Sequence, residues 1–160
     1  MRHLLVPTDF SETAASALNQ EVKLAALSGG RITLLHVIYT DKISETLLGL
    51  DAMENLARAM NAPPESAPYS PTHAMSQLRE AAQRRLDEVI AAVAAQNVVL
   101  ETAVVEGRPS TEVLQYATEH GVDLIVMGTH GRSALGRAFL GSVADNVIRQ
   151  AECPVMVVRR

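Results

Sequence analysis

One stretch near the carboxyl end restricts the fold more than any other, because an apolar run leads directly into a loop with four glycines. The apolar run covers residues 124–127, and the loop extends from Gly128 to Ser142. An unbroken apolar run of this kind is typical of a parallel strand that is buried on both faces. Residues 143–148 then have apolar side chains four apart, which is the spacing of one helix face. The sequence therefore predicts a strand, a glycine-rich loop and a helix in succession.

The glycine-rich loop contains the parts of a phosphate site. Glycines let main-chain N–H groups approach an anion without a Cβ in the way, and a helix N-terminus adds unpaired N–H donors and a positive dipole end. Arg132 and Arg137 supply cations, and Ser142 can cap the helix or offer its hydroxyl to a phosphate. The alternative is a plain turn between Gly128 and Gly141. Four glycines and two arginines at the carboxyl end of a strand favour phosphate binding, although the loop matches neither a P-loop nor a dinucleotide motif.

The spacing of these residues, Gly128-x2-Gly131-x9-Gly141-Ser142, resembles the ATP-binding signature of the universal stress protein family. The resemblance covers nearly the whole chain. Residues 6–9 are similar to the family's first strand and turn, residues 35–37 to its second strand, residues 107–109 to its third strand–helix turn, and residues 153–158 to its last strand. Because the glycines occur together with Asp9, the chain resembles the branch of the family that binds ATP.

The resemblance implies an adenine-nucleotide site at the carboxyl ends of the strands. ATP, or another adenine nucleotide, is the expected ligand, with Mg²⁺ as a companion ion to which no metal ligand is assigned. The adenosine would lie near Pro7, Asp9 and Val37, and the phosphates near the glycine loop. The residues expected to bind the nucleotide are Pro7, Thr8, Asp9, Val37, Met127, Gly128, His130, Gly131, Arg132, Gly141, Ser142 and Val143. Ala144 stands where many members have a further hydroxyl, so one phosphate contact is missing.

Two residues near this site have ordinary structural alternatives. Asp9 and Glu12 are spaced like a capping box, so the residues alone favour Asp9 as the N-cap of the first helix, with Ser11 as a rival. The resemblance instead places Asp9 against the adenosine. His36 lies within the second expected strand, where a histidine is more often packed or hydrogen-bonded than catalytic.

Strands alternate with helices along the chain, which predicts one parallel, doubly wound sheet with helices on both faces. The strands are expected at residues 3–6, 32–38, 98–105, 123–127 and 154–158. The resemblance implies an adenine nucleotide alpha hydrolase-like fold with five strands in the order 3-2-1-4-5, in which strands 1 and 4 are central neighbours. Residues 1–160 would form a single domain, with a variable insertion of helix and loop at about residues 40–76.

Helical periodicity predicts which side chains cover the sheet. Ala14, Leu18, Val22 and Ala25 share one face of the first helix, and Gly29 should end that helix. A second stripe, in a helix expected from about residue 73 to residue 96, consists of Leu78, Ala82, Leu86, Val89 and Val93.

Composition limits the class of protein. Apolar residues make up 48% of the 160 residues and aromatic residues only 3%, so the core must be aliphatic. A net charge of −4 and so few aromatic side chains argue against a nucleic-acid binder. No apolar run is long enough to span a membrane, and the amino-terminal run is too short for a signal peptide. A single cysteine fits a reducing compartment, so the expected location is the cytoplasm.

The sequence is compatible with three functions. The first is a regulatory, ATP-binding protein of the stress response that forms a homodimer through its exposed C-terminal strand, residues 155–158. The second is an ATP hydrolase or phosphotransferase that uses the same pocket. The loop has no acidic residue between Gly128 and Val143 to serve as base or metal ligand. Glu12 and Asp145 are nearby in sequence, but cap and helix-dipole roles explain them equally well, and His130 could act as a base. Slow or absent hydrolysis is therefore expected, with no catalytic residue assigned. The third is an interaction protein with an empty pocket, against which the intact glycines count.

Overall fold

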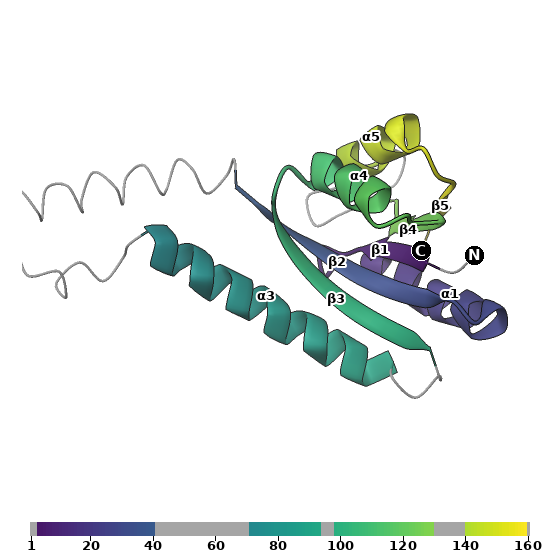
Figure 1. The fold of residues 1–160 in the computed structure, drawn as a ribbon, viewed down its shortest axis with the longest axis horizontal. Coiled ribbons are helices and arrows are strands. Elements are labelled where there is room, and N and C mark those ends of the chain that lie inside the picture. Colours follow the sequence, from purple (N-terminus) through teal and green to yellow (C-terminus); the bar gives the residue numbers. More distant parts are fainter. Residues whose placement is uncertain (1–2, 41–70, 94–97, 130–139, 160) are drawn as a thin grey trace, which may run out of the picture.

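The computed structural model describes residues 3–40, 71–93, 98–129 and 140–159, which contain a five-stranded parallel sheet (Figure 1). The strands are β1 (His3–Pro7), β2 (Arg31–Tyr39), β3 (Val99–Gly107), β4 (Leu124–Gly128) and β5 (Val155–Val158). Their order is β3-β2-β1-β4-β5, which confirms the predicted order. β1 lies in the middle, where Val6 is opposite Leu34 of β2 and Leu5 is opposite Ile125 of β4.

Helices cover both faces of the sheet, as predicted. The described helices are α1 (Glu12–Ser28), α3 (Pro71–Val93), α4 (Pro109–Glu119) and α5 (Ser142–Gln150). α1 and α3 pack on one face, and α4 and α5 pack on the other (Figure 1). The carboxyl ends of β1 and β4 therefore lie next to each other in the middle of the sheet, at the point where the strand order reverses.

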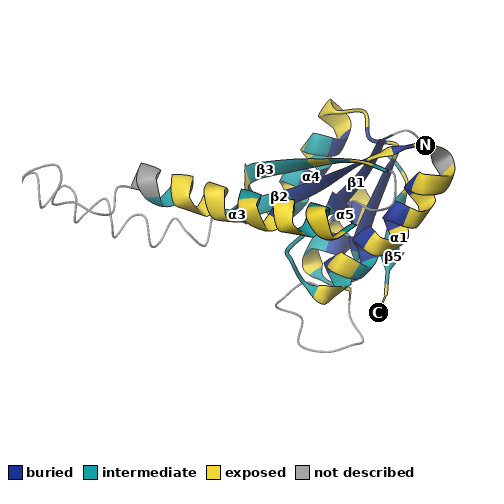
Figure 2. Cartoon of the chain, turned by 90° about the horizontal axis from the view of Figure 1, so that it is seen from below, coloured by how far each residue is buried: buried dark blue, intermediate teal, exposed yellow. Residues whose placement is uncertain are grey.

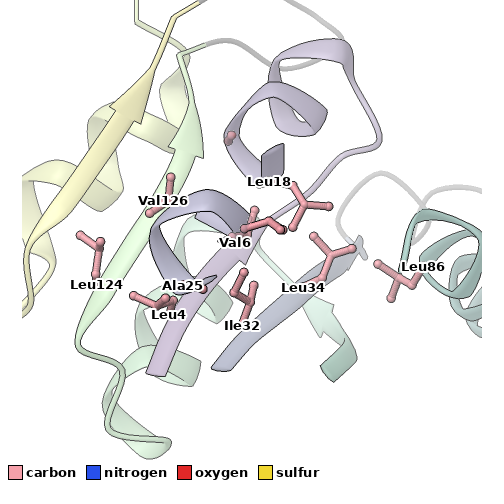
Figure 3. Packing of buried hydrophobic residues seen from close by; sticks show 11 residues of the cluster. Leu4, Val6, Leu18, Ala25, Ile32, Leu34, Leu86, Leu124 and Val126 are labelled. Carbon is pink, nitrogen blue, oxygen red and sulfur yellow. The ribbon is translucent and has the colours of Figure 1, made fainter. Parts of the chain in front are cut away.

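The core consists of two aliphatic clusters separated by the sheet. Successive side chains of a strand point to opposite faces, so Leu4 and Val6 join one cluster while Leu5 joins the other. Figure 3 shows the first cluster, in which the strand side chains meet Leu18 of α1 and Leu86 of α3. Each fully buried leucine, isoleucine or valine contributes about 1.5–3 kcal/mol. The absence of tryptophan is thus offset by many small contributions rather than by a few large ones.

Helix α1 confirms the predicted core face and corrects the predicted cap. The four side chains expected to cover the sheet are all buried. Gly29 ends the helix in the left-handed conformation, with φ of 67°, and its N–H donates to the Ala25 carbonyl at 2.8 Å. At the other end the N-cap is Ser11, whose Oγ accepts from the Ala14 N–H at 3.3 Å. The interpretation of Asp9 as the N-cap is therefore wrong, and the rival residue fills that position.

Helix α3 begins at Pro71, two residues before the expected start, and the expected insertion before it falls mostly on residues 41–70, outside the described residues. Ala82 and Leu86 are buried, and Val89 and Val93 pack against the first cluster, as predicted. Leu78 is 42% exposed, so its place in the buried stripe was wrong. The reason is length: Figure 2 shows that the amino-terminal part of this 23-residue helix extends beyond the sheet.

Candidate functional site

The turn after β1 is fixed by hydrogen bonds to a strand and to its own side chains. The Thr8 N–H donates to the Leu35 carbonyl of β2 at 2.8 Å. The Phe10 N–H then donates to Thr8 Oγ1 at 3.0 Å, and the Ser11 N–H donates to Asp9 Oδ1 at 3.0 Å. Side-chain oxygens of this kind replace main-chain acceptors in tight turns. The structure thus places Pro7, Thr8 and Asp9 together at the carboxyl edge of the sheet.

Gly128, the last residue of β4, lies against the first turn of α1. A Cβ added there would lie 2.9 Å from Thr13 Cβ and 3.0 Å from the Thr13 carbonyl carbon. No side chain fits without moving the helix, so glycine at this position lets α1 approach β4. Close packing therefore explains why residue 128 is a glycine, whereas the sequence suggested only a turn or a phosphate site there. It also brings the segment after β1 beside the start of the glycine loop.

The two ends of the glycine loop are joined by the main chain of Thr129. Its N–H donates to the Val158 carbonyl of β5 at 3.1 Å, and its carbonyl accepts from the Gly141 N–H at 2.8 Å. The loop therefore leaves the sheet at Thr129 and returns to the same residue before α5 begins. His130, Gly131 and Arg132 fall within the loop and lie outside the described residues.

The amino terminus of α5 stands at this return point. Gly141 is the N-cap, with φ of −63° and ψ of 147°, and its carbonyl accepts the first helical hydrogen bond from the Asp145 N–H at 2.9 Å. Ser142 is the first helical residue, so the expectation that it caps the helix is wrong, and its exposed side chain makes no capping bond. Helix geometry leaves the N–H groups of Ser142, Val143 and Ala144 without acceptors inside the helix. These donors and the serine hydroxyl suit an anion.

Three further predicted residues belong to the apolar layer beneath this edge. Met127 is buried in the second cluster, and Val37 and Val143 are half-buried against the same cluster. Their side chains therefore pack the sheet against α4 and α5. Any contact that Met127 makes with a ligand must come from its main chain, whereas Val37 and Val143 also retain partly exposed side chains.

Charged groups near the site are engaged with each other. Asp145, in the first turn of α5, accepts hydrogen bonds from Arg149 Nε at 3.1 Å to Oδ1 and 3.0 Å to Oδ2.

Within the described residues no cluster of three or more histidine, cysteine, aspartate or glutamate side chains could hold a metal ion. The described helices also include none that is long and apolar enough to cross a bilayer.

Two hollows lie away from these residues. One, of about 790 Å³, lies between α4 and the carboxyl-terminal end of α5, beside Leu114 and Cys153. The other, of about 350 Å³, lies between α1 and β5, beside Leu27 and Val157. Neither is lined by a residue predicted to bind nucleotide. The charged residues that line the larger hollow, Glu119 and Glu152, are both acidic and would repel a phosphate, so its size alone does not make it the site.

Sequence reasoning missed two residues that shape this edge. Thr129 closes the loop through its main chain, for which the sequence has no specific signal. Thr13 lies against Gly128, and the only available signal was the glycine itself, whose missing side chain leaves room for a neighbour.

Comparison with known proteins gives one consistent family. The profile of the universal stress protein family matches residues 1–62 and 56–159. The universal stress protein MJ0577 of Methanocaldococcus jannaschii is 31% identical over 99% of this chain and 95% of its own, and YxiE of Bacillus subtilis is 31% identical over 98% and 97%. The solved MJ0577 structure has a TM-score of 0.75 at 30% identity, covering 99% of this chain and 96% of that one. A universal stress protein from Archaeoglobus fulgidus, solved in complex with dAMP, shares the fold, with a TM-score of 0.61 at 18% identity over 98% and 97% of the chains.

Proposed function

The chain belongs to the universal stress protein family, and we propose that it is a regulatory protein of the stress response that binds ATP and acts as a cytoplasmic homodimer. The observation that carries the proposal is the loop closure at Thr129, where the Gly141 N–H meets the Thr129 carbonyl. This bond brings the start of the glycine loop and the amino terminus of α5 together, beside the turn that holds Asp9.

The proposed ligand lies along the carboxyl edge of the sheet. Its phosphates are bound by the unpaired N–H groups at the start of α5 and by the Ser142 hydroxyl, because both are donors and the helix dipole favours an anion there. Arg132 is the proposed cation. The adenosine lies toward Pro7, Asp9 and the main chain of Val37. A nucleotide is proposed rather than a free phosphate because the carboxyl edge combines the donors at the start of α5 with the partly exposed Val37 and the carboxylate of Asp9.

The proposed activity is binding without rapid turnover. Hydrolysis requires a base or a metal carboxylate near the terminal phosphate. Asp145 is the acidic residue at the start of α5, and both of its oxygens accept from Arg149. Because Asp145 already has Arg149 as its partner, we assign it neither role, which favours a regulatory protein over a hydrolase or phosphotransferase.

The proposed dimer forms through β5. This strand pairs with β4 on one side and is the sheet edge, so its other side offers unpaired main-chain groups to a second strand. The hollow between β5 and α1 is lined by Val157 and by two exposed leucines, Leu24 at 43% and Leu27 at 87%. An apolar surface beside an open edge suits a second copy related by a twofold axis.

Mass spectrometry of ligand extracted from natively purified protein tests the proposal. An adenine nucleotide in near-stoichiometric amount, absent from a Gly141→Val variant, is the expected result. This variant blocks the N-cap position sterically, and the negative φ of Gly141 allows valine without backbone strain. Protein that neither carries nor takes up an adenine nucleotide would refute the proposal.

A further inference from the structure

The turn that carries Asp9 has a backbone conformation that needs support from outside. Phe10 has φ of 61°, and no other non-glycine residue within the described ranges has a positive φ. The left-handed conformation costs an L-residue with a bulky side chain about 1–2 kcal/mol of conformational free energy. Such a conformation persists where surrounding contacts over-determine it. The contacts around Phe10 and its neighbours therefore decide where Asp9 lies.

His36 supplies the first of these contacts from β2. Its Nδ1 lies 2.8 Å from the Thr8 carbonyl oxygen. A carbonyl only accepts hydrogen bonds, so Nδ1 carries the hydrogen and donates. The adjacent Leu35 carbonyl accepts from the Thr8 N–H at 2.8 Å. Two consecutive residues of β2 thus hold both main-chain polar groups of Thr8, one residue before Asp9.

The second contact is between the rings of Phe10 and His36, on the face of the sheet that α1 and α3 cover. The centroids of the Phe10 and His36 rings are 4.5 Å apart, with an interplanar angle of 36°. The guanidinium carbon of Arg85 in α3 lies 4.5 Å from the centroid of the Phe10 ring. His36 therefore contacts both residues that flank Asp9, Thr8 through a hydrogen bond and Phe10 through its ring.

We propose that His36 is a positioning residue for the nucleotide site. This inference rests on the proposed function. His36 does not touch the ligand. It holds the turn 8–11 in the strained conformation that presents Asp9 to the adenosine, while Val37, next to it on β2, packs toward the opposite face. Loss of the Nδ1 donor should therefore weaken binding of the adenosine part of any ligand, whether or not phosphates are present.

Two variants of His36 separate this role from general stability. His36→Leu removes the donor and replaces the ring with an apolar side chain. His36→Asn retains an N–H donor attached to Cγ, as Nδ1 is in histidine. Leu100→Ala is the matched control, because it also removes packing from the first cluster, but Leu100 pairs with Ile32, four residues before His36 on β2. Affinities for ATP and adenosine are measured by calorimetry at a temperature where every variant is folded.

The expected result is a loss of about three- to tenfold in His36→Leu. The same factor is expected for ATP and for adenosine, with recovery to within about twofold in His36→Asn and no change in Leu100→Ala. The Phe10 and Ser11 amides should also exchange hydrogen faster in His36→Leu alone. If the wild type binds no adenine compound, the proposed function falls and this inference with it. If the wild type binds but His36→Leu binds equally well, or His36→Asn is as weak as His36→Leu, only the positioning role is overturned.

Discussion

Replacing Glu21, a carboxyl group buried in α1, is expected to stabilise the protein. The residue is 0% exposed, and within the described structure neither carboxyl oxygen has a hydrogen-bond partner. Leu18 and Ala25, one turn away on either side, belong to the apolar core. Burial accordingly raises the pKa of Glu21 above its ordinary value.

The size of the effect follows from the missing partners. An unsatisfied buried polar group costs about 1–3 kcal/mol, and more when it is charged. Methionine has a similar length and no polar group to satisfy, so Glu21→Met should raise the free energy of unfolding by about 1–3 kcal/mol. For a chain of this size each kcal/mol raises the melting temperature by roughly 2–4 °C. Urea and thermal unfolding followed by circular dichroism measure both quantities.

The sign of the pH dependence is also determined. Because the pKa is raised in the folded state, the folded protein binds the proton more tightly than the unfolded chain does. The stability that the protonated Glu21 contributes is fully present below the ordinary glutamate pKa and is lost as the pH rises through the raised pKa of the folded state. The advantage of Glu21→Met should therefore be larger at about pH 8 than at about pH 5. Glu21→Gln should remove the pH-dependent part but stabilise less, because its amide is still unpaired. A Glu21→Met protein that is less stable than wild type at both pH values would refute this reasoning.

Four other substitutions or reactions probe separate parts of the structure. Gly128→Ala should cost about 1–3 kcal/mol in urea unfolding, since its Cβ meets Thr13; a neutral result would contradict the close packing. Val157→Lys should convert the proposed dimer to monomer in sedimentation, and a monomeric wild type would exclude that dimer. Ser142→Ala should weaken ATP about tenfold in calorimetry but leave adenosine unchanged. Burial raises the pKa of the Cys153 thiol, so iodoacetamide should alkylate it more slowly than free glutathione at neutral pH.

Much of the fold could be predicted because its signals are local. The apolar strands and the face formed by Ala14, Leu18, Val22 and Ala25 follow from periodicity, and the left-handed cap at Gly29 follows from glycine's freedom. The strand order did not follow from periodicity. It came from resemblance to a family, and the observed pairing confirms it.

The features that could not be predicted depend on contacts between distant segments. Asp9 and Ser11 are both good capping residues, and Ser11 becomes the cap after a turn at Phe10, whose ring lies against His36 of β2. Gly128 has a packing reason that becomes visible only when α1 is placed against β4. Burial of Glu21 contradicts the ordinary preference of its residue type, so composition offers no warning of it.

Titration of the wild-type protein with ATP and with adenosine tests most directly whether the edge formed by Thr129, Gly141 and the start of α5 binds phosphates. Isothermal calorimetry at low and at high salt compares the two ligands on the same folded protein. ATP is expected to bind at least about ten times more tightly than adenosine, and its advantage should shrink at high salt because screening weakens charge-assisted contacts. Equal affinities for the two ligands, or no binding of ATP, would contradict the assignment of this edge as a nucleotide site.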